Sequence, residues 1–146
     1  MKTAVDTGVL IAAYAGEGPG QRDCAEAIER ALDDDKLVIV ANAISAFVET
    51  VTDTTRFENA PTLPQVTDLC NEFASAANVE IADLSNDDLV AALSLLREHE
   101  LPADRLDPAL QAVRLRRLGV SRLLTTDADA FAEFGFIETE DPRRAA

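Results

Sequence analysis

Four acidic side chains occupy places where a carboxylate can do chemistry as well as hydrate a surface. Asp6 directly follows an apolar run, Asp127 closely follows another, Asp107 stands where a helical stretch begins, and Glu49 flanks a helical apolar stripe. Carboxylates that are brought together raise one another's pKa values unless a cation neutralises them. Hard oxygen ligands favour Mg²⁺ or Mn²⁺, which can bind a scissile phosphate and lower the pKa of an attacking water. The joint arrangement therefore predicts a metal-dependent phosphodiester cleavage site.

Each of these acids also has a purely structural interpretation. Asp6 and Asp107 could each cap the helix that follows, and Glu49 could be a solvated helix residue. Asp104 is a second candidate for the role of Asp107. The site prediction requires the acids to meet in space, so it depends on the elements that carry them.

Hydrophobic periodicity predicts a chain in which strands and helices alternate. Strands are expected at 2–5, 37–41, 79–82 and 120–125, with a last short one around 135–137. Helices are expected at 7–14, 21–32 and 64–77, after a cap at Asn42, from Ser85, and from Asp107 to a stop at Gly119. This order predicts a three-layer α/β domain with a parallel sheet. Ligands bind at the carboxyl ends of such strands, so Asp6 and Asp127 would share one crevice if their strands are neighbours.

The charge balance at face value argues against nucleic-acid partners and anionic membranes. The chain has 27 acidic and 13 basic residues, a formal net charge of −14 and a sequence pI near 4.3. Lys2 and Lys36 are its only lysines. This pattern is typical of a halophilic protein, whose dense carboxylates keep the surface hydrated. At 1 M salt the Debye length is about 3 Å, so net charge then says little about docking.

Several other classes of protein are disfavoured by the sequence. Cys24 and Cys70 do not make a disulfide framework in a chain of this length. The single histidine, His99, is too few for a His-rich zinc site or a Ser-His-Asp triad. The N-terminal segment does not resemble a signal peptide, and the apolar stretch at 9–15 is too short to span a membrane. We therefore expect a soluble cytoplasmic protein without membrane association.

Four segments, in this order and spacing, resemble the acidic motifs of a PIN domain. They are VDTGVLIA at 5–12, SAFVETV at 45–51, LDPALQA at 106–112 and LLTTDADAF at 123–131. The resemblance covers nearly the whole chain and is nearest to the small ribonucleases of VapC type, the toxin half of toxin–antitoxin pairs. It implies a three-layer α/β/α PIN-like fold with a central parallel sheet of four to five strands. We expect one nuclease domain over 1–139 and a polar C-terminal tail over 140–146.

The resemblance also implies a site and its partners. It identifies Asp6, Glu49, Asp107 and Asp127 as the acidic quartet that holds Mg²⁺ or Mn²⁺, and Asp129 as an additional metal-binding acid. It implies RNA as the substrate, cleaved as an endoribonuclease by a metal-activated water. It further implies a small antitoxin protein as partner and a homodimer.

Two further positions and two departures from the family pattern accompany this site. Thr7 and Thr125 stand beside family positions that often orient metal-bound water. Pro108 directly follows the third acid, where the family more often has another residue, and a proline is tolerated at a helix start. Ala130 separates Asp129 from the aromatic residue that commonly follows it directly.

Alternatives remain open at this point. Arg114, Arg116 and Arg117 on the helix that Asp107 begins either contact RNA phosphates or pair with surface acids. A phosphatase or receiver-type phosphotransfer domain would also gather acids at strand ends. Both of these phosphotransfer classes use a lysine in the later part of the chain, yet no lysine follows Lys36. A catalytically silent PIN-like binding module is the other rival, against which the retention of all four acids argues.

Overall fold

Five strands form the central sheet of the computed structural model, which describes residues 1–16, 18–34, 36–83 and 85–144. They are β1 (Lys2–Val5), β2 (Lys36–Val40), β3 (Val79–Ala82), β4 (Arg122–Leu124) and β5 (Glu138–Glu140). Their order is β3-β2-β1-β4-β5, and all neighbours run parallel, which confirms the predicted sheet. The order reverses beside β1. The topological switch point, where ligands bind in sheets of this kind, therefore lies between β1 and β4.

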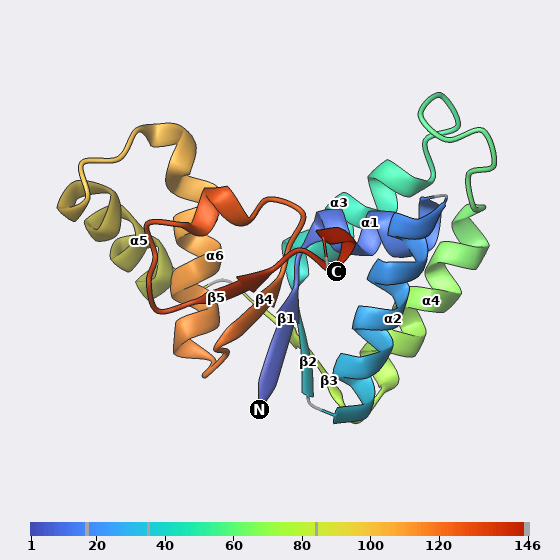
Figure 1. The fold of residues 1–146 in the computed structure, drawn as a ribbon, viewed down its shortest axis with the longest axis horizontal. Coiled ribbons are helices and arrows are strands. Elements are labelled where there is room, and N and C mark those ends of the chain that lie inside the picture. Colours follow the sequence, from blue (N-terminus) through green and yellow to red (C-terminus); the bar gives the residue numbers. More distant parts are fainter. Residues whose placement is uncertain (17, 35, 84, 145–146) are drawn as a thin grey trace.

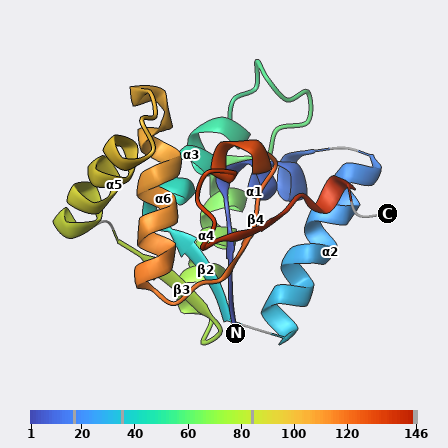
Figure 2. The same cartoon turned by 60° about the vertical axis from the view of Figure 1, so that its left-hand side comes forward.

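Helices cover both faces of this sheet. They are α1 (Thr7–Ala15), α2 (Pro19–Asp34), α3 (Ala41–Val51), α4 (Leu63–Ser75), α5 (Asn86–Glu98) and α6 (Leu106–Arg117). Figure 1 shows α5 and α6 on one side of the sheet and α1, α2 and α4 on the other, and Figure 2 agrees. α3 packs against α1 and α4. The three-layer α/β/α prediction is thereby confirmed.

The core extends over both faces because the central strands are apolar on both sides. Residues 37–40 of β2 are all buried, as are residues 3–5 of β1 and Leu123 and Leu124 of β4. Phe47 from α3 and Leu115 from α6 are buried against them. Within the described residues, no helix has the length and apolar character that a membrane crossing requires.

α3 begins earlier than the sequence predicts. Its first residue is Ala41, its N-cap is Val40, and no side chain caps it. Asn42 was the predicted cap, but it lies in the first helical turn. There its side-chain oxygen accepts a hydrogen bond from Arg114 at 3.0 Å. The prediction was wrong because the chain turns directly from β2 into the helix, without an intervening polar residue.

α6 also begins one residue before the predicted start. A 3-10 turn, η1 (Ala103–Arg105), runs directly into the helix at Leu106, so Asp107 is the second helical residue and Pro108 the third. Proline is tolerated there because the first four N–H groups of a helix have no partner within it. The predicted stop is confirmed, since Gly119 follows the helix with a φ of 76°.

The last strand lies three residues beyond its predicted place. Pairing begins where the Glu138 N–H donates to the Ser121 carbonyl at 2.9 Å. Ile137, which stood in the predicted strand, is instead buried in the turn before it, together with Phe134. A hydrogen bond of 3.2 Å from the Ile137 N–H to the Phe134 carbonyl closes this turn.

The segment after position 139 continues the fold over its described part. The Glu140 carbonyl in β5 accepts a hydrogen bond from the Thr125 N–H at 2.9 Å. Asp141 is buried, and the Arg143 guanidinium donates to its carboxylate at 3.0 and 2.8 Å. A short 3-10 turn, η3 (Pro142–Arg144), packs against α2. Residues 145–146 of the expected polar tail lie outside the described residues.

Candidate active site

Asp6 and Asp127 meet at the switch point because their strands are neighbours. Val5 is in register with Leu124, whose carbonyl accepts a hydrogen bond from the Asp6 N–H at 3.0 Å. Thr125 is fully buried and connects the two acids. Its hydroxyl donates to one carboxylate oxygen of Asp6 and accepts from the Asp127 N–H at 3.0 Å. The two strands are therefore neighbours, which is the condition that the sequence set for a shared site.

The Asp6 carboxylate is held from a second side by α1. Its other oxygen accepts a hydrogen bond from the Val9 N–H at 3.0 Å, which makes Asp6 the N-cap of this helix. Burial raises the pKa of Asp6, and the Asp127 carboxylate raises it further. Hydrogen bonds from Thr125, Val9 and Gly8 oppose this rise. Asp6 is thus both a cap and a partly buried acid beside a second carboxylate.

A glycine permits the two acid-bearing segments to approach. Gly8 lies in the first turn of α1, and a Cβ at this position would overlap the Thr126 hydroxyl oxygen. The same Cβ would stand 3.3 Å from the Thr126 Cβ. Since Thr126 directly precedes Asp127, any larger residue at position 8 must displace the segment that carries the second acid.

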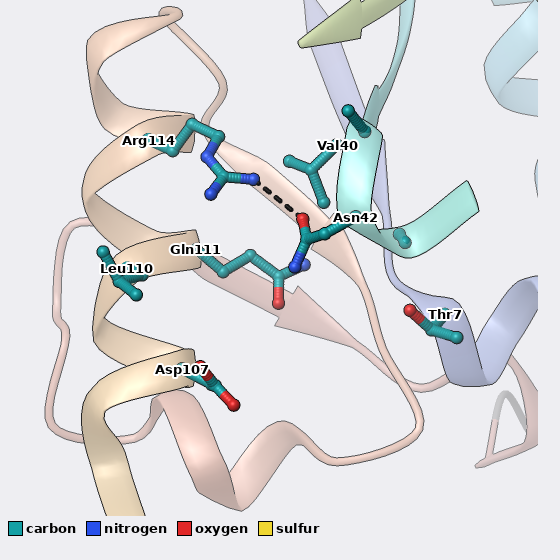
Figure 3. Close-up of a pocket in the computed structure, with 9 residues that line it drawn as sticks. Thr7, Val40, Asn42, Asp107, Leu110, Gln111 and Arg114 are labelled. Atoms are coloured by element: carbon teal, nitrogen blue, oxygen red, sulfur yellow. Dashed lines mark hydrogen bonds between the residues drawn. The ribbon is translucent and has the colours of Figure 1, made fainter. Parts of the chain in front are cut away.

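A cavity of about 530 Å³ opens between α6, the first turn of α3 and the start of α1 (Figure 3). Thr7, which follows Asp6 in the chain, lines it from α1, and residues 40–43 line it from the start of α3. From α6 come Asp107, Gln111 and Arg114, spaced i, i+4 and i+7 on one helix face. Figure 3 shows Asp107 and Arg114 at opposite ends of this face, with Gln111 between them.

Of the five predicted acids, Asp107 is the one that lines this cavity, and Asp6, Asp127, Glu49 and Asp129 are not among its lining residues. Glu49 is exposed on α3, about two turns beyond the turn that lines the cavity. Asp129 is exposed in the 3-10 turn η2 (Ala128–Phe131). Within the described residues, no three His, Cys, Asp or Glu side chains gather as a metal cage. The structure thus joins Asp6 to Asp127 and sets Asp107 on the cavity wall.

The three arginines of α6 have different environments. Arg117 donates two hydrogen bonds of 2.8 and 2.9 Å to the buried carboxylate of Asp88. Arg116 is exposed, with its guanidinium carbon 4.8 Å from the ring centre of Phe136. Arg114 is buried and faces the cavity. Of the two alternatives left open by the sequence, ion pairing therefore applies to Arg117.

Asn42 and Gln111 line the cavity, and sequence reasoning missed both as site residues. The spacing contained a signal for Gln111, because it lies four residues after Asp107 on the same helix face. No comparable signal existed for Asn42. Its place in the cavity depends on α3 starting at Ala41, directly after β2.

Comparison with known proteins adds structural relatives but no sequence relatives. No protein-family model and no curated protein matches the chain. A toxin–antitoxin complex from Klebsiella pneumoniae matches with a TM-score of 0.62 and 18% identity, over 96% of this chain and 97% of that chain. VapBC2 from Rickettsia felis, bound to a promoter DNA fragment, matches with a TM-score of 0.66 and 16% identity, over 96% and 98%. VapC20 from Mycobacterium tuberculosis, a sarcin-ricin loop cleaving toxin, matches with a TM-score of 0.66 and 14% identity, over 95% and 99%. At these identities the likeness establishes the fold, and the chain has the PIN-like α/β/α fold of these toxin–antitoxin structures.

Proposed function

We propose that this protein is a metal-dependent endoribonuclease and the toxin of a toxin–antitoxin pair. The observation that carries the proposal is the Asp6–Thr125–Asp127 connection at the switch point of the sheet, next to a cavity whose wall holds Asp107. The fold likeness to VapC20, a toxin that cleaves the sarcin-ricin loop, supports RNA as the substrate. The acidic motifs at 5–12 and 123–131 support the same class of enzyme.

A divalent cation suits the carboxylates that are present. Burial raises the pKa of Asp6 and the Asp127 charge adds to this rise, and a cation held by the two carboxylates would favour their charged forms. Mg²⁺ commonly keeps several waters and takes only one or two carboxylates, so a complete protein cage is not required. We propose that Asp6 and Asp127 hold Mg²⁺ or Mn²⁺ and that Asp107 is the third acid. Glu49 and Asp129 stay predictions as further ligands.

The chain's own residues fix the geometry of this site. The Thr125 hydroxyl and the Val9 N–H each hold one oxygen of the Asp6 carboxylate, so its orientation is set before substrate arrives. Asp107 presents an exposed carboxylate from the first turn of α6 to the cavity. A bound metal would supply charge neutralisation at the scissile phosphate and a lowered pKa for the attacking water.

The proposal extends to partners and location. A small antitoxin protein is the proposed partner, because the matching structures include toxin–antitoxin complexes. The resemblance of the acidic motifs supports a homodimer, and the sequence features of the N-terminal segment support a cytoplasmic location. Light scattering in molar KCl, with and without the antitoxin, measures the assembly directly.

Cleavage of total RNA with Mn²⁺ in molar KCl tests the activity. We expect Asp107→Asn to lower the rate by about a hundredfold or more, the range typical for loss of a catalytic carboxylate. Asp104→Asn is the matched control. It removes the same charge from an exposed residue three positions away, and the cavity lining does not include it. Equal cleavage by the parent and Asp107→Asn would reject the site.

Thermal unfolding with Mn²⁺ tests the metal separately. A ligand at a hundred times its Kd stabilises the folded state by about 2.7 kcal/mol, so the parent should melt at a higher temperature with Mn²⁺. Asp6→Asn should abolish this rise while keeping the helix cap, because asparagine also caps well. A parent protein that does not respond to Mn²⁺ or Mg²⁺ would reject the nuclease proposal and favour the silent binding module.

A further inference from the structure

Arg114 is a buried cation that forms no salt bridge with any carboxylate of the described residues. It is 4% exposed, and among the described residues its Nε has no hydrogen-bond partner. The neutral side chain of Asn42 accepts a hydrogen bond from its guanidinium at 3.0 Å. Asp88, whose charge acts on Arg114, is already bound through both oxygens by Arg117.

The surroundings of Arg114 do not fully compensate the desolvation of its charge. Burial lowers the pKa of Arg114, yet a guanidinium stays protonated in proteins. A buried charge is normally paired and fully hydrogen-bonded, because its desolvation is otherwise not compensated. A neutral amide supplies only part of that compensation, so an anion is the missing partner.

A second set of donors faces the same cavity from α3. This helix has eleven residues, its N-cap Val40 supplies no side-chain hydrogen bond, and residues 40–43 line the cavity. The first N–H groups of a helix lack partners within the helix and carry a partial positive charge. Backbone N–H groups at a helix start, together with a guanidinium, are the donors that bind phosphate.

We propose that this cavity binds a phosphate group between the Arg114 guanidinium and the first turn of α3. Resting on the proposed function, the group is a phosphodiester of the RNA that flanks the scissile one. Asp107 and Arg114 are seven residues apart on one face of α6, which is about 10 Å along the helix at 1.5 Å per residue. The cation end of the cavity is therefore separate from the acid end, and it positions the RNA strand without joining the reaction.

Titration with inorganic phosphate in EDTA tests the site without metal or cleavage. Melting temperature and the Arg side-chain N–H signals in NMR are followed, with chloride at equal ionic strength as the reference. We expect saturable binding to the parent and binding about tenfold weaker in Arg114→Gln. Arg116→Gln removes the same charge from the same helix, but its side chain does not line the cavity, so it should bind like the parent. Equal phosphate binding by Arg114→Gln and the parent would overturn the proposal.

Asn42→Asp is a second variant, which does not require removal of the buried arginine. It keeps the side-chain size and places a carboxylate where Arg114 now donates to an amide. We expect a higher melting temperature, because the carboxylate pairs with Arg114, and weaker phosphate binding, because it repels the anion. A purely structural arginine would give the first change without the second, so unchanged phosphate binding in this variant contradicts the site.

Experiments with RNA distinguish the phosphate site from the proposed nuclease activity. A short labelled RNA in EDTA should compete with inorganic phosphate for the parent, which separates a nucleic-acid phosphate from the free ion. With Mn²⁺, Arg114→Gln should raise KM about tenfold at nearly unchanged kcat, whereas Asp107→Asn should lower kcat. If the parent binds phosphate through Arg114 but cleaves no RNA, the nuclease proposal fails and the phosphate site stands. If RNA is cleaved with an unchanged KM in Arg114→Gln, the phosphate site fails and the nuclease stands.

Discussion

Gly8→Ala is expected to destabilise the protein although it replaces a glycine inside a helix. Gly8 lies in the first turn of α1 without a positive φ, so alanine meets no backbone strain there. Such a replacement usually gains about 0.5–1 kcal/mol. Here the new Cβ would overlap the Thr126 hydroxyl oxygen. The sign of the change therefore depends on how the segment after β4 relieves the overlap.

The size of the effect follows from what can move. Rotation of the Thr126 side chain would remove the hydroxyl from the overlap but would leave its Cβ at 3.3 Å, so the backbone must give by a few tenths of an ångström. Overpacking of this kind costs about 1–3 kcal/mol. After the helix gain is subtracted, the free energy of unfolding should fall by up to about 2.5 kcal/mol. Because Asp127 moves with Thr126, the response of melting temperature to Mn²⁺ should weaken as well.

Urea unfolding in molar KCl, arranged as a double-mutant cycle, measures this coupling. Thr126→Ala removes the overlapping oxygen but keeps the Cβ at 3.3 Å, so Gly8→Ala combined with Thr126→Ala should recover only the part of the loss that the hydroxyl causes, about 1 kcal/mol relative to additivity. Thr126→Val is the matched control, because it keeps the branched shape and should give no such recovery. A Gly8→Ala protein more stable than the parent, or strictly additive effects with Thr126→Ala, would refute the reasoning.

Two further substitutions test buried hydrogen bonds, one set between α5 and α6 and one beside Asp6. Asp88→Asn should lower the free energy of unfolding at pH 7 by about 1–2 kcal/mol, because the buried carboxylate accepts hydrogen bonds from Arg117 and from the Ser85 N–H. Arg117 holds the pKa of Asp88 below its ordinary value, so this stability is present above the unfolded pKa of about 3.9 and is lost as pH falls through the lowered pKa. Urea unfolding across this range should show parent and variant converging in acid, and a constant difference would contradict the assignment. Thr125→Val keeps the buried shape but removes a donor that lowers the pKa of Asp6, so Asp6 should take up its proton at higher pH. An NMR titration of the Asp6 carboxyl that matches the parent's would disprove this role.

The parallel sheet could be predicted because its central strands carry their own signal. Residues 37–40 are apolar without interruption and buried on both faces, and an acid stands directly after the first strand and three residues after the fourth. β5 carried no such signal. It is a three-residue edge strand of sequence ETE with an exposed first residue, so its position is set by pairing with β4 rather than by hydrophobic pattern.

The site was predictable only where it follows from strand ends. Asp6 and Asp127 were placed together by topology, since Asp6 directly follows β1, Asp127 lies three residues after the end of β4, and those strands are neighbours. The cavity depends on where α3 starts and on which face α6 turns inward. Hydrophobic periodicity locates both of these less accurately than it locates buried strands. One residue of difference in the start of α3 decides whether Asn42 caps the helix or contacts Arg114. Glu49 flanked an apolar stripe, yet that flank of α3 is exposed.

The net charge of −14 is compatible with the proposed RNA substrate because the arginines differ in their pairing with carboxylates. Arg117, Arg122 and Arg143 each pair with a carboxylate, so they add little to the field that an approaching RNA meets. Arg114 has a neutral partner instead, and its charge remains available within the cavity. If the protein works at high salt, as its composition predicts, attraction at long range is screened and the gain from counterion release is small. Phosphate recognition must then arise from contacts inside the cavity. A carboxylate introduced inside the cavity by Asn42→Asp should therefore weaken RNA binding at high salt, whereas the acids on the surface are screened and should affect this binding little.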